Sequence, residues 1–423
     1  MEKCPLSSGA ARGNITPKDN ILPLPFVFGI NMDGVADEVY VRVLDLDDGN
    51  NRALFISFEM SMIPYAEETM QFICDNTGLT NDKIFLSATH THEVPFIGIE
   101  GFPDTEPKHR IWYEEIKSVL KHAIIKAAQN KRPARIGFGM GKSYLNINRD
   151  EVGKSDPGVN FERPSDKTLA LIRIEDEKGS PIAFVVNYAV HGVFLNGCIV
   201  DGVIKISGDI PGRTSTKLEE KFDGAVALWT SGAAGDQNPR IMSQYGAEIK
   251  DGKVTVKSLG EAGYMILDFL VDEHVNDILK VNETLKCDAS NARIFIAEQA
   301  VSCPGRITES GAVPGAVAPK KTDSPPDAKY TLKLLTVGDI AIQGISAEVV
   351  TSIGAAVRGG SPYKKTILVT QAGKYGGYVP DDWGYENNTF EASGTPVQKG
   401  YAEPAFVKAF AEMFEKEKER STP

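Results

Sequence analysis

The alternation of short apolar runs with helical patterns is the feature that most limits the folds open to this chain. Short runs rich in β-branched and other apolar residues, typical of buried strands, recur along most of the sequence. Between them lie longer stretches whose apolar residues return every three or four positions, the period of an amphipathic helix. This pattern predicts an α/β protein with a mixed β-sheet core flanked by helices. No change of composition divides the chain, so we expect a single large domain over residues 1–423.

The individual elements can be placed approximately. The expected strands are 40–46, 53–58, 84–89, 134–138, 170–174, 182–188, 225–230, 333–337, 340–345 and 366–370. The expected helices are 64–76, 112–129, 211–222, 259–279, 348–357 and 405–418. Segment 303–329 is rich in Pro, Gly, Ala and Lys and has no periodicity. We expect an irregular surface loop there or, alternatively, a lid over a site.

The net charge restricts the classes of binding partner that we expect, and the cysteines and the N-terminus indicate the cellular compartment. The chain has a net charge of −11 and no cluster of Lys and Arg, so we expect it to bind neither nucleic acid nor a membrane surface. It contains no run of roughly 20 apolar residues that would span a bilayer. The 5 cysteines are scattered, as in proteins with reduced thiols, and the N-terminus has no apolar signal segment. We therefore expect a cytoplasmic protein with a small-molecule substrate; the oligomeric state stays open.

Two of the 6 histidines, His90 and His92, stand at alternate positions directly after the apolar run 84–89. In an extended strand, alternate side chains face the same side. Such a pair can hold a metal ion, or one imidazole can hold the ion while the other polarises a substrate; it can also be a plain surface pair. For the histidines in polar or helical stretches we expect solvent-exposed side chains: His109, His122 and His274.

Three further apolar runs end in polar residues followed by Gly, Pro or a helical pattern. Run 184–190 ends at His191, run 227–231 leads into Asp236 and Asn238, and run 340–347 ends at Glu348, which we expect to open a helix. Strand ends are where α/β sheets build their sites. Two histidines and a carboxylate from separate strand ends form a common catalytic metal set that leaves a position open. Taken alone, Glu348 is more simply a favourable partner of a helix dipole.

Taken in order, these segments resemble the neutral (non-lysosomal) ceramidase family, which are zinc-dependent amidases of N-acyl sphingosine. The resemblance runs along nearly the whole chain and implies the mixed-sheet fold of the ceramidase catalytic domain. The segments that carry it are 9–17 (GAARGNITP), 89–92 (THTH), 146–149 (NINR), 187–192 (NYAVHG), 207–212 (SGDIPG), 235–239 (GDQNP), 347–350 (AEVV) and 375–379 (YGGYV).

The resemblance also implies a set of site residues. One zinc ion (Zn2+) per chain would be held by four residues: His90, His191, Glu348 and Tyr378. His92 and Arg149 would face the substrate carbonyl and stabilise its developing negative charge. Asn238 would position the substrate, and Tyr378 would count among the catalytic residues as well as the ligands. We expect Asp236 to support its loop instead of binding the metal.

The chain departs from the family at two positions. Where the ceramidases carry the active serine of their Gly-Asp-x-Ser-Pro motif, this chain has Asn238. An amide can hydrogen-bond a substrate but cannot act as a hydroxyl nucleophile. A family tyrosine near the zinc falls at Phe390, where the hydroxyl is lost. We also expect neither the family's C-terminal immunoglobulin-like domain nor its leader.

These observations favour a zinc-dependent hydrolase of a small amide, ester or lactone instead of ceramide, with metal-bound water as the nucleophile. Arg149 would then assist as an oxyanion donor, although its permanent charge also suits a carboxylate on the ligand. A first alternative is a metal-assisted lyase or isomerase that abstracts a proton next to a metal-bound carbonyl. A second is an inactive binding protein on the same fold.

Overall fold

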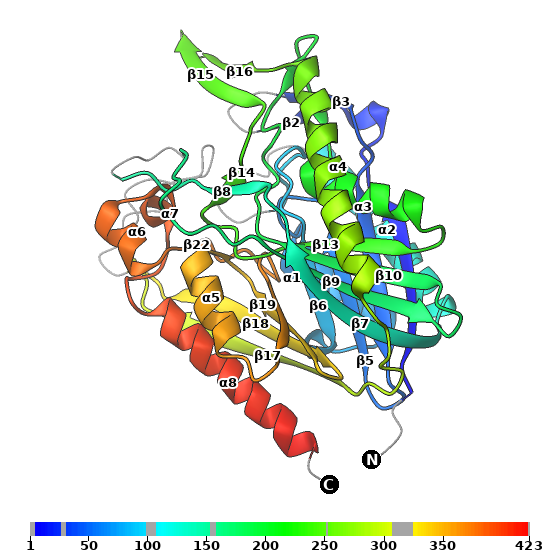
Figure 1. Ribbon diagram of the computed structural model, residues 1–423. Helices are drawn as coiled ribbons and strands as arrows, with labels where there is room; N and C mark the ends of the chain where they lie inside the picture. The colour runs from blue at the N-terminus through cyan, green and yellow to red at the C-terminus, as the bar shows by residue number, and fades with distance from the viewer. Residues whose placement is uncertain are drawn as a thin grey trace.

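Two β-sheets packed face to face form the centre of the molecule, with helices on both outer sides (Figure 1). The structure is a computed structural model that describes residues 5–26, 31–98, 107–152, 158–250, 253–306 and 325–421. The larger sheet has eight strands in the order β13 (Val226–Ser231), β10 (Pro181–Tyr188), β9 (Thr168–Asp176), β7 (Arg132–Lys142), β1 (Ser7–Asn14), β4 (Tyr40–Asp47), β5 (Arg52–Phe58) and β6 (Ile84–Ala88). The smaller sheet has four, in the order β17 (Ile294–Cys303), β18 (Ala328–Val337), β19 (Ile340–Ile345) and β21 (Lys365–Val369).

Alternation of side chains along the strands explains the layers. In β5, Phe55 points into the core between the two sheets, where it meets Phe85 at 4.6 Å between ring centroids. Its neighbours Leu54 and Ile56 point the other way, into the core beneath the helices. Both faces of the strand are therefore buried, which accounts for its continuous apolar run.

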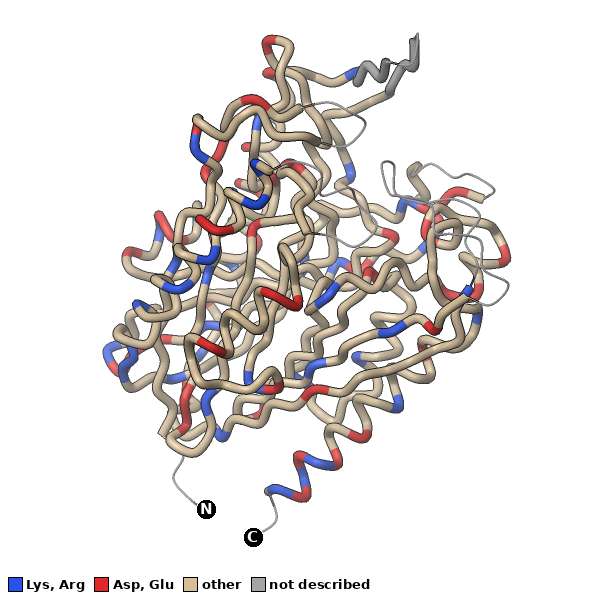
Figure 2. Tube along the Cα trace, turned by 180° about the vertical axis from the view of Figure 1, so that it is seen from behind, with Lys and Arg blue, Asp and Glu red and all other residues tan. Residues whose placement is uncertain are grey.

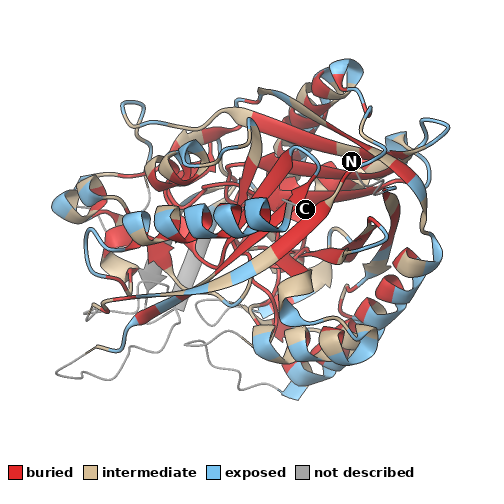
Figure 3. Ribbon diagram, turned by 90° about the horizontal axis from the view of Figure 1, so that it is seen from below, coloured by how far each residue is buried: buried red, intermediate tan, exposed pale blue. Residues whose placement is uncertain are grey.

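Six longer helices cover the outer faces of the two sheets. Helices α1 (Ala66–Thr77) and α2 (Pro107–Gln129) pack on the part of the larger sheet that contains β1, β4 and β5. Helices α3 (Asp209–Lys221) and α4 (Glu261–Thr284) cover the part that contains β9, β10 and β13. Helices α5 (Thr351–Gly359) and α8 (Ala402–Ser421) cover the smaller sheet. Seen from below, the strands are mostly buried and α8 turns an exposed face to solvent (Figure 3).

The remaining elements are short and surround the ends of the main strands. Strands β2 (Leu24–Pro25), β3 (Asn31–Val35), β11 (Ile199–Val200) and β12 (Val203–Ile206) form a second four-stranded sheet. Three two-stranded pairs join β8 (Asn146–Asn148) with β14 (Gln237–Pro239), β15 (Gln244–Lys250) with β16 (Lys253–Ser258), and β20 (Glu348–Val349) with β22 (Tyr378–Val379). The short helices are η1 (Asp19–Ile21), η3 (Asn81–Lys83), α6 (Asp382–Asn387) and α7 (Phe390–Gly394).

The larger sheet curls so that its two edges come together. Strands β1 and β7, at its middle, are paired over only two positions, Ser7 with Pro133 and Ser8 with Arg132. The edge strands β6 and β13 accordingly contact each other, and the Ser57 hydroxyl of β5 donates to the Trp229 carbonyl of β13 at 3.1 Å. The chain segments that leave β6 and β10 meet at a bridge between Thr91 and Gly192. Residues at these strand ends, far apart in sequence, therefore share one site.

The mixed α/β class predicted from the sequence is confirmed, and the predicted strands and helices are found with small shifts at their ends. Of the strands in the two main sheets, β1 and β17 were not predicted, and neither were the short strands outside these sheets. The prediction that Glu348 opens a helix is wrong: Glu348 lies in β20, and α5 begins at Thr351, because Glu348 pairs with the strand that contains Tyr378. Most of the expected loop or lid at 303–329, namely 307–324, lies outside the described residues.

Charged residues of both signs are interspersed along the outer elements, including α8 (Figure 2). Within the described ranges, none of the helices combines the length and the apolar character needed to cross a bilayer.

Candidate active site

The site begins where the loops after β6 and β10 touch. The His92 N–H donates to the Gly192 carbonyl at 2.8 Å, next to the bridge between Thr91 and Gly192. A Cβ atom on Gly192 would lie 2.8 Å from Thr91 Cα and 2.9 Å from the His90 carbonyl oxygen. Position 192 therefore requires glycine, because any side chain there would push the two histidine-bearing loops apart.

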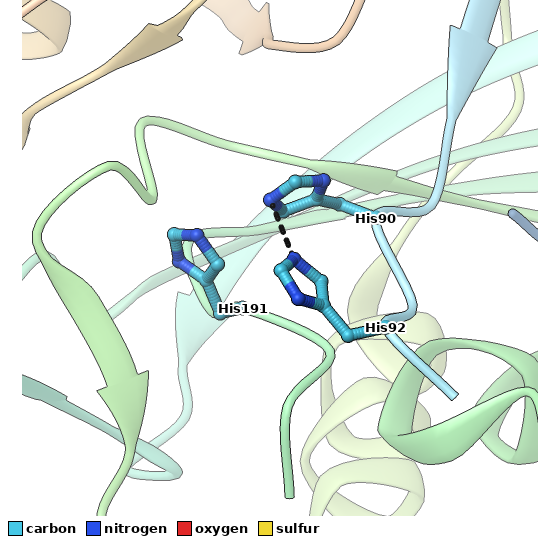
Figure 4. Close-up of side chains that lie close together, drawn as sticks. All are labelled: His90, His92 and His191. Carbon is cyan, nitrogen blue, oxygen red and sulfur yellow. Dashed lines mark hydrogen bonds between the residues drawn. The ribbon is translucent and has the colours of Figure 1, made fainter. Parts of the chain in front are cut away.

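Three imidazoles converge at this contact (Figure 4). Ring nitrogens of His90, His92 and His191 all lie within 4.8 Å of one another. His90 Nε2 and His92 Nε2 are 3.2 Å apart. His90 and His191 are buried and His92 is half-buried. The sequence singled out all three residues, but it gave His92 a role toward the substrate, whereas the structure also places it within reach of a shared ion.

Glu348 joins the histidines from β20, which follows strand β19 of the smaller sheet. Its Oε2 lies 3.0 Å from His90 Nε2 and 2.9 Å from His191 Nε2. Tyr375 hydrogen-bonds the same carboxylate. Glu348 is also the register partner of Tyr378 in the parallel pair of β20 and β22, so the two side chains leave their strands in the same direction. The expected ligands His90, His191 and Glu348 therefore lie together, with Tyr378 on the neighbouring strand.

The tautomers of two histidines follow from their backbone contacts. His90 Nδ1 lies 2.7 Å from the Ser61 carbonyl oxygen, and His191 Nδ1 lies 3.2 Å from the Gln237 carbonyl oxygen. A carbonyl only accepts, so in each ring we assign the proton to Nδ1. Both Nε2 atoms then point a lone pair at Glu348 Oε2, itself an acceptor when ionised. Neither ring then donates a proton to Oε2 through its Nε2. This convergence of acceptor atoms suits a bound cation, and the backbone contacts orient the rings as in other metal sites.

Burial disfavours the charged form of each of these groups, so it lowers the pKa of a histidine and raises that of a carboxyl group. Burial, with Arg149 nearby, lowers the pKa of His191 to about 4. Burial and the neighbouring imidazoles hold the pKa of His92 well below its usual range. Burial by itself raises the pKa of the Glu348 carboxyl, and positive charge or a hydrogen-bond donor at His90 and His191 lowers it. A metal ion likewise favours an ionised carboxylate and requires neutral imidazole ligands.

Arg149 lies next to this cluster, and each of its three side-chain nitrogens donates a hydrogen bond. Its Nε donates to Glu391 Oε1 at 2.8 Å, its Nη1 to Asn238 Oδ1 at 3.0 Å and its Nη2 to Tyr378 Oη at 3.2 Å. The guanidinium also lies 5.3 Å from the centroid of the Phe390 ring. Arg149 is only 4% exposed, so its charge acts in a medium of low polarity. Two residues that the sequence assigned to the site, Asn238 and Tyr378, are therefore hydrogen-bonded to Arg149.

The two positions that depart from the ceramidase pattern both lie in the site. Asn238, in β14, turns its Oδ1 to Arg149 and its Nδ2 toward Met242 Sδ at 3.4 Å. Phe390, the first residue of α7, packs its ring edge-on to Tyr378 with centroids 5.7 Å apart. These positions carry an amide and an apolar ring where the family resemblance implies hydroxyl groups.

Asp236 supports the loop that contains Asn238, as the sequence suggested. Its Oδ1 accepts from the Thr351 N–H and hydroxyl, both at 2.8 Å, and its Oδ2 accepts from Asn148 Nδ2 at 2.8 Å. Gly235 lets this loop approach β20, since a Cβ there would lie 2.9 Å from the Val349 carbonyl. Asp236 thus ties β8, β14 and the start of α5 together around the site.

Two of the three histidines expected to be exposed are buried. His109 is 2% exposed and His274 is 0% exposed, whereas His122 is exposed as predicted. Apolar residues at helical spacing around His274 place it on the inner face of α4, a signal that the sequence contained. Trp229 Nε1 donates to His274 Nε2 at 3.5 Å, so His274 Nδ1 carries the proton and donates to Ser143 Oγ at 3.0 Å. A histidine that donates to the serine cannot serve as its base.

Sequence reasoning missed three residues around the site. Tyr375 belonged to a recognised segment but received no role, although it hydrogen-bonds Glu348. Glu391 and Asp150 lie behind Arg149, both buried. The sequence offered one signal for these two residues: Asp150 directly follows Arg149, and Glu391 directly follows Phe390.

Comparisons with known proteins were made by sequence and by structure. No protein-family model matches the chain. The chain is similar to neutral ceramidase A of Dictyostelium discoideum, with 30% identity over 234 residues that cover 49% of this chain and 31% of that protein. Neutral ceramidase B of the same organism is 27% identical over 234 residues, with the same coverage. The match thus spans about a third of the length of these relatives.

The structural comparison covers nearly the whole chain. The crystal structure of neutral ceramidase from Pseudomonas aeruginosa matches with a TM-score of 0.75 and 15% identity, over 99% of this chain and 75% of that chain. At this identity the match establishes the fold. The resemblance to neutral ceramidases noted from the motifs is confirmed, in sequence over half of the chain and in fold over 99% of it.

Proposed function

We propose that this ceramidase-like protein is a metal-dependent hydrolase that cleaves an amide, ester or lactone bond in a small molecule, with water as the nucleophile. The observation that carries the proposal is the convergence of His90, His191 and Glu348, whose lone pairs face one another in a buried site. An ion at this point removes the repulsion between the acceptors, and the ceramidase-like fold favours hydrolysis over other metal-assisted reactions.

Zinc is the ion we propose. Imidazole nitrogen and carboxylate oxygen form common catalytic zinc sets with a position left open. His90, His191 and Glu348 would be ligands, and Tyr378, next to Glu348 on β22, would be the fourth. His92 would face the substrate from beside His90. Zinc bound there would polarise a carbonyl oxygen and lower the pKa of a bound water molecule.

The role of Arg149 follows from its burial and its contacts. Its guanidinium adjoins Tyr378 and is held on three sides, so its remaining N–H groups keep a constant direction. A fixed cation in a site of low polarity stabilises negative charge that develops on a carbonyl oxygen, at no cost of reorientation. Arg149 is already paired with Glu391, which favours this role over neutralising a substrate carboxylate.

Asn238 supports water as the nucleophile. Its side-chain oxygen accepts from Arg149, which turns the amide nitrogen the other way, toward Met242. That nitrogen is a donor, so it can bind an acceptor atom of the substrate, but it cannot take the part of a serine hydroxyl. Asn238 would therefore position the substrate.

The test is product analysis in heavy-oxygen water with zinc-loaded protein. The panel comprises short-chain N-acyl amines, esters and lactones, together with a short-chain ceramide, since the relatives are ceramidases by name. We expect one labelled oxygen in the carboxylic acid product, and loss of turnover in Glu348→Gln but not in His122→Ala. Turnover without label would identify a lyase or isomerase instead. Binding of panel compounds without turnover would identify a binding protein, and hydrolysis of ceramide alone would correct the substrate class.

A further inference from the structure

A pair of buried carboxyl groups lies directly behind Arg149. Glu391 is 0% exposed and Asp150 is 2% exposed. Glu391 Oε1 accepts from Arg149 Nε at 2.8 Å, and the Asp150 carboxyl is a hydrogen-bond partner of the Glu391 carboxyl. The pair is assembled from the loop after β8 and from α7, on the side of Arg149 that faces away from Asn238 and Tyr378.

One oxygen of each carboxyl group in this pair has no hydrogen-bond donor among the described residues. Among the described residues, no N–H or O–H group donates to Asp150 Oδ1 or to Glu391 Oε2. Two carboxyl groups form a hydrogen bond with each other only when one of them carries a proton. A single shared proton would therefore provide the missing donor and leave one negative charge opposite the one positive charge of Arg149.

The groups around the pair do not replace that proton. Arg163 Nη2 lies 3.8 Å from Asp150 Oδ2, too far for a hydrogen bond. Its closer partner is Asp381, the residue before α6, whose Oδ2 lies 3.0 Å away. Asp236, from the loop before β14, adds a further negative charge. Burial raises the pKa of Asp150 well above its usual range, Glu391 and Asp236 raise it further, and Arg149 only partly opposes them. Like charges in a buried site favour one shared proton.

We propose that Asp150 and Glu391 share one proton at neutral pH and act together as positioning residues for Arg149. This proposal rests on the proposed function in one respect, namely the assignment of Arg149 to the substrate. Asp150 supplies the proton and Glu391 the charge that holds Arg149 Nε. With both carboxyls ionised, excess negative charge would draw the guanidinium toward the pair and away from Asn238 and Tyr378. With both protonated, Arg149 would lose its buried counter-charge.

The shared proton is tested by infrared spectroscopy of the metal-free protein at neutral pH. The carbonyl band of a protonated carboxylic acid should be present in the wild type and reduced in Asp150→Asn, whose amide donates to Glu391 without a titratable proton. Glu93→Gln is the matched control, because burial raises the pKa of Glu93 to about 8 and that residue is a separate source of such a band. An Asp150→Asn spectrum with an unchanged protonated-acid band would overturn the proposal.

The positioning of Arg149 is tested by the hydrogen exchange of its Nε–H, observed by NMR with labelled arginine. We expect slow exchange in the wild type and in Asp150→Asn, and exchange at least 10-fold faster in Asp150→Ala and in Glu391→Gln, as roughly a factor of 10 corresponds to the loss of one net hydrogen bond. Equal exchange in Asp150→Asn and Asp150→Ala would refute positioning by the pair. Far-UV circular dichroism of each variant checks that it folds.

Both readouts are independent of catalysis, so the two proposals can fail separately. If the panel finds no hydrolysis, the infrared band and the Nε–H exchange still decide on the pair. If hydrolysis is found, kcat should fall by about 10- to 100-fold in Asp150→Ala and recover in Asp150→Asn, because displacement of a reacting group by about 1 Å costs on that order. Zinc content should not change in any of these variants, since neither residue is among the proposed ligands.

Discussion

His90 Nε2 lies 3.0 Å from Glu348 Oε2, although the two residues are 258 positions apart in the chain. His90 follows β6 of the larger sheet and Glu348 follows β19 of the smaller sheet, and these two sheets pack face to face. The Ser61 carbonyl holds the other nitrogen of the His90 ring. The contact therefore joins the two halves of the fold and sets up the acceptor cluster from which the proposed function follows.

Metal content gives the first prediction. Zinc-loaded wild type should hold about one ion per chain, and His90→Ala and Glu348→Ala should lose it, because each variant removes one of the four proposed protein ligands. Elemental analysis after gel filtration measures this. His122→Ala removes an exposed histidine of α2 and should keep the full content. A metal-free wild type, even after zinc is added, would contradict the metal centre.

Gly192→Ala should loosen the site without touching a ligand side chain. The new methyl would lie 2.8 Å from Thr91 Cα, so backbone must move. Overpacking of this kind costs about 1–3 kcal/mol in the free energy of unfolding, and the histidine loops should also bind zinc more weakly. Denaturant unfolding and zinc titration measure the two effects. Gly359→Ala in α5 is the control, since no atom lies within 4 Å of its added Cβ; equal behaviour of the two variants would argue against the close approach.

Arg149→Lys should keep the zinc and lose most of the activity. Lysine has the charge but not the planar fork that reaches Glu391, Asn238 and Tyr378 together. Loss of one such donor to a developing oxyanion lowers kcat by about 100- to 1,000-fold. Steady-state kinetics with a substrate from the panel measure the change, and Arg110→Lys, at an exposed position of α2, should be unaffected. An unchanged kcat would remove Arg149 from the reaction.

His274 should make the protein sensitive to acid. Burial lowers its pKa to about 4 in the folded state, from 6.5 for the free side chain. A depressed folded-state pKa contributes stability that is fully present above pH 6.5 and is lost as the pH falls toward 4. The loss amounts to about 3 kcal/mol, from about 1.4 kcal/mol for each pKa unit.

The non-titrating variant His274→Gln should lower the stability at neutral pH but flatten its decline below pH 6.5 relative to wild type. Urea unfolding across this pH range measures the slope. His122→Gln is the matched control, because it also removes one histidine but from an exposed position. If both variants show the wild-type slope, His274 does not contribute to acid unfolding.

Local patterns were sufficient for the parts of the site that stand at strand ends. His90, His191 and Glu348 each follow a run of apolar residues, and such a run marks a buried strand wherever it occurs. The same reasoning failed for the helical assignment of Glu348, because its strand pairs only with a segment near Tyr378 that lies outside any local window. It also failed for His274, whose apolar neighbours on α4 are visible only when helical spacing is considered.

The sequence by itself determined the α/β class, the order of the elements and the residues able to bind a metal, because apolar periodicity and side-chain chemistry are local properties. The tertiary structure alone decided that three imidazoles and Glu348 meet, which tautomers they adopt, and that Asp150 and Glu391 stand behind Arg149. Those facts depend on how one sheet curls and on how it packs against the other. Both arise from contacts among many residues far apart in the chain, so no short segment encodes them.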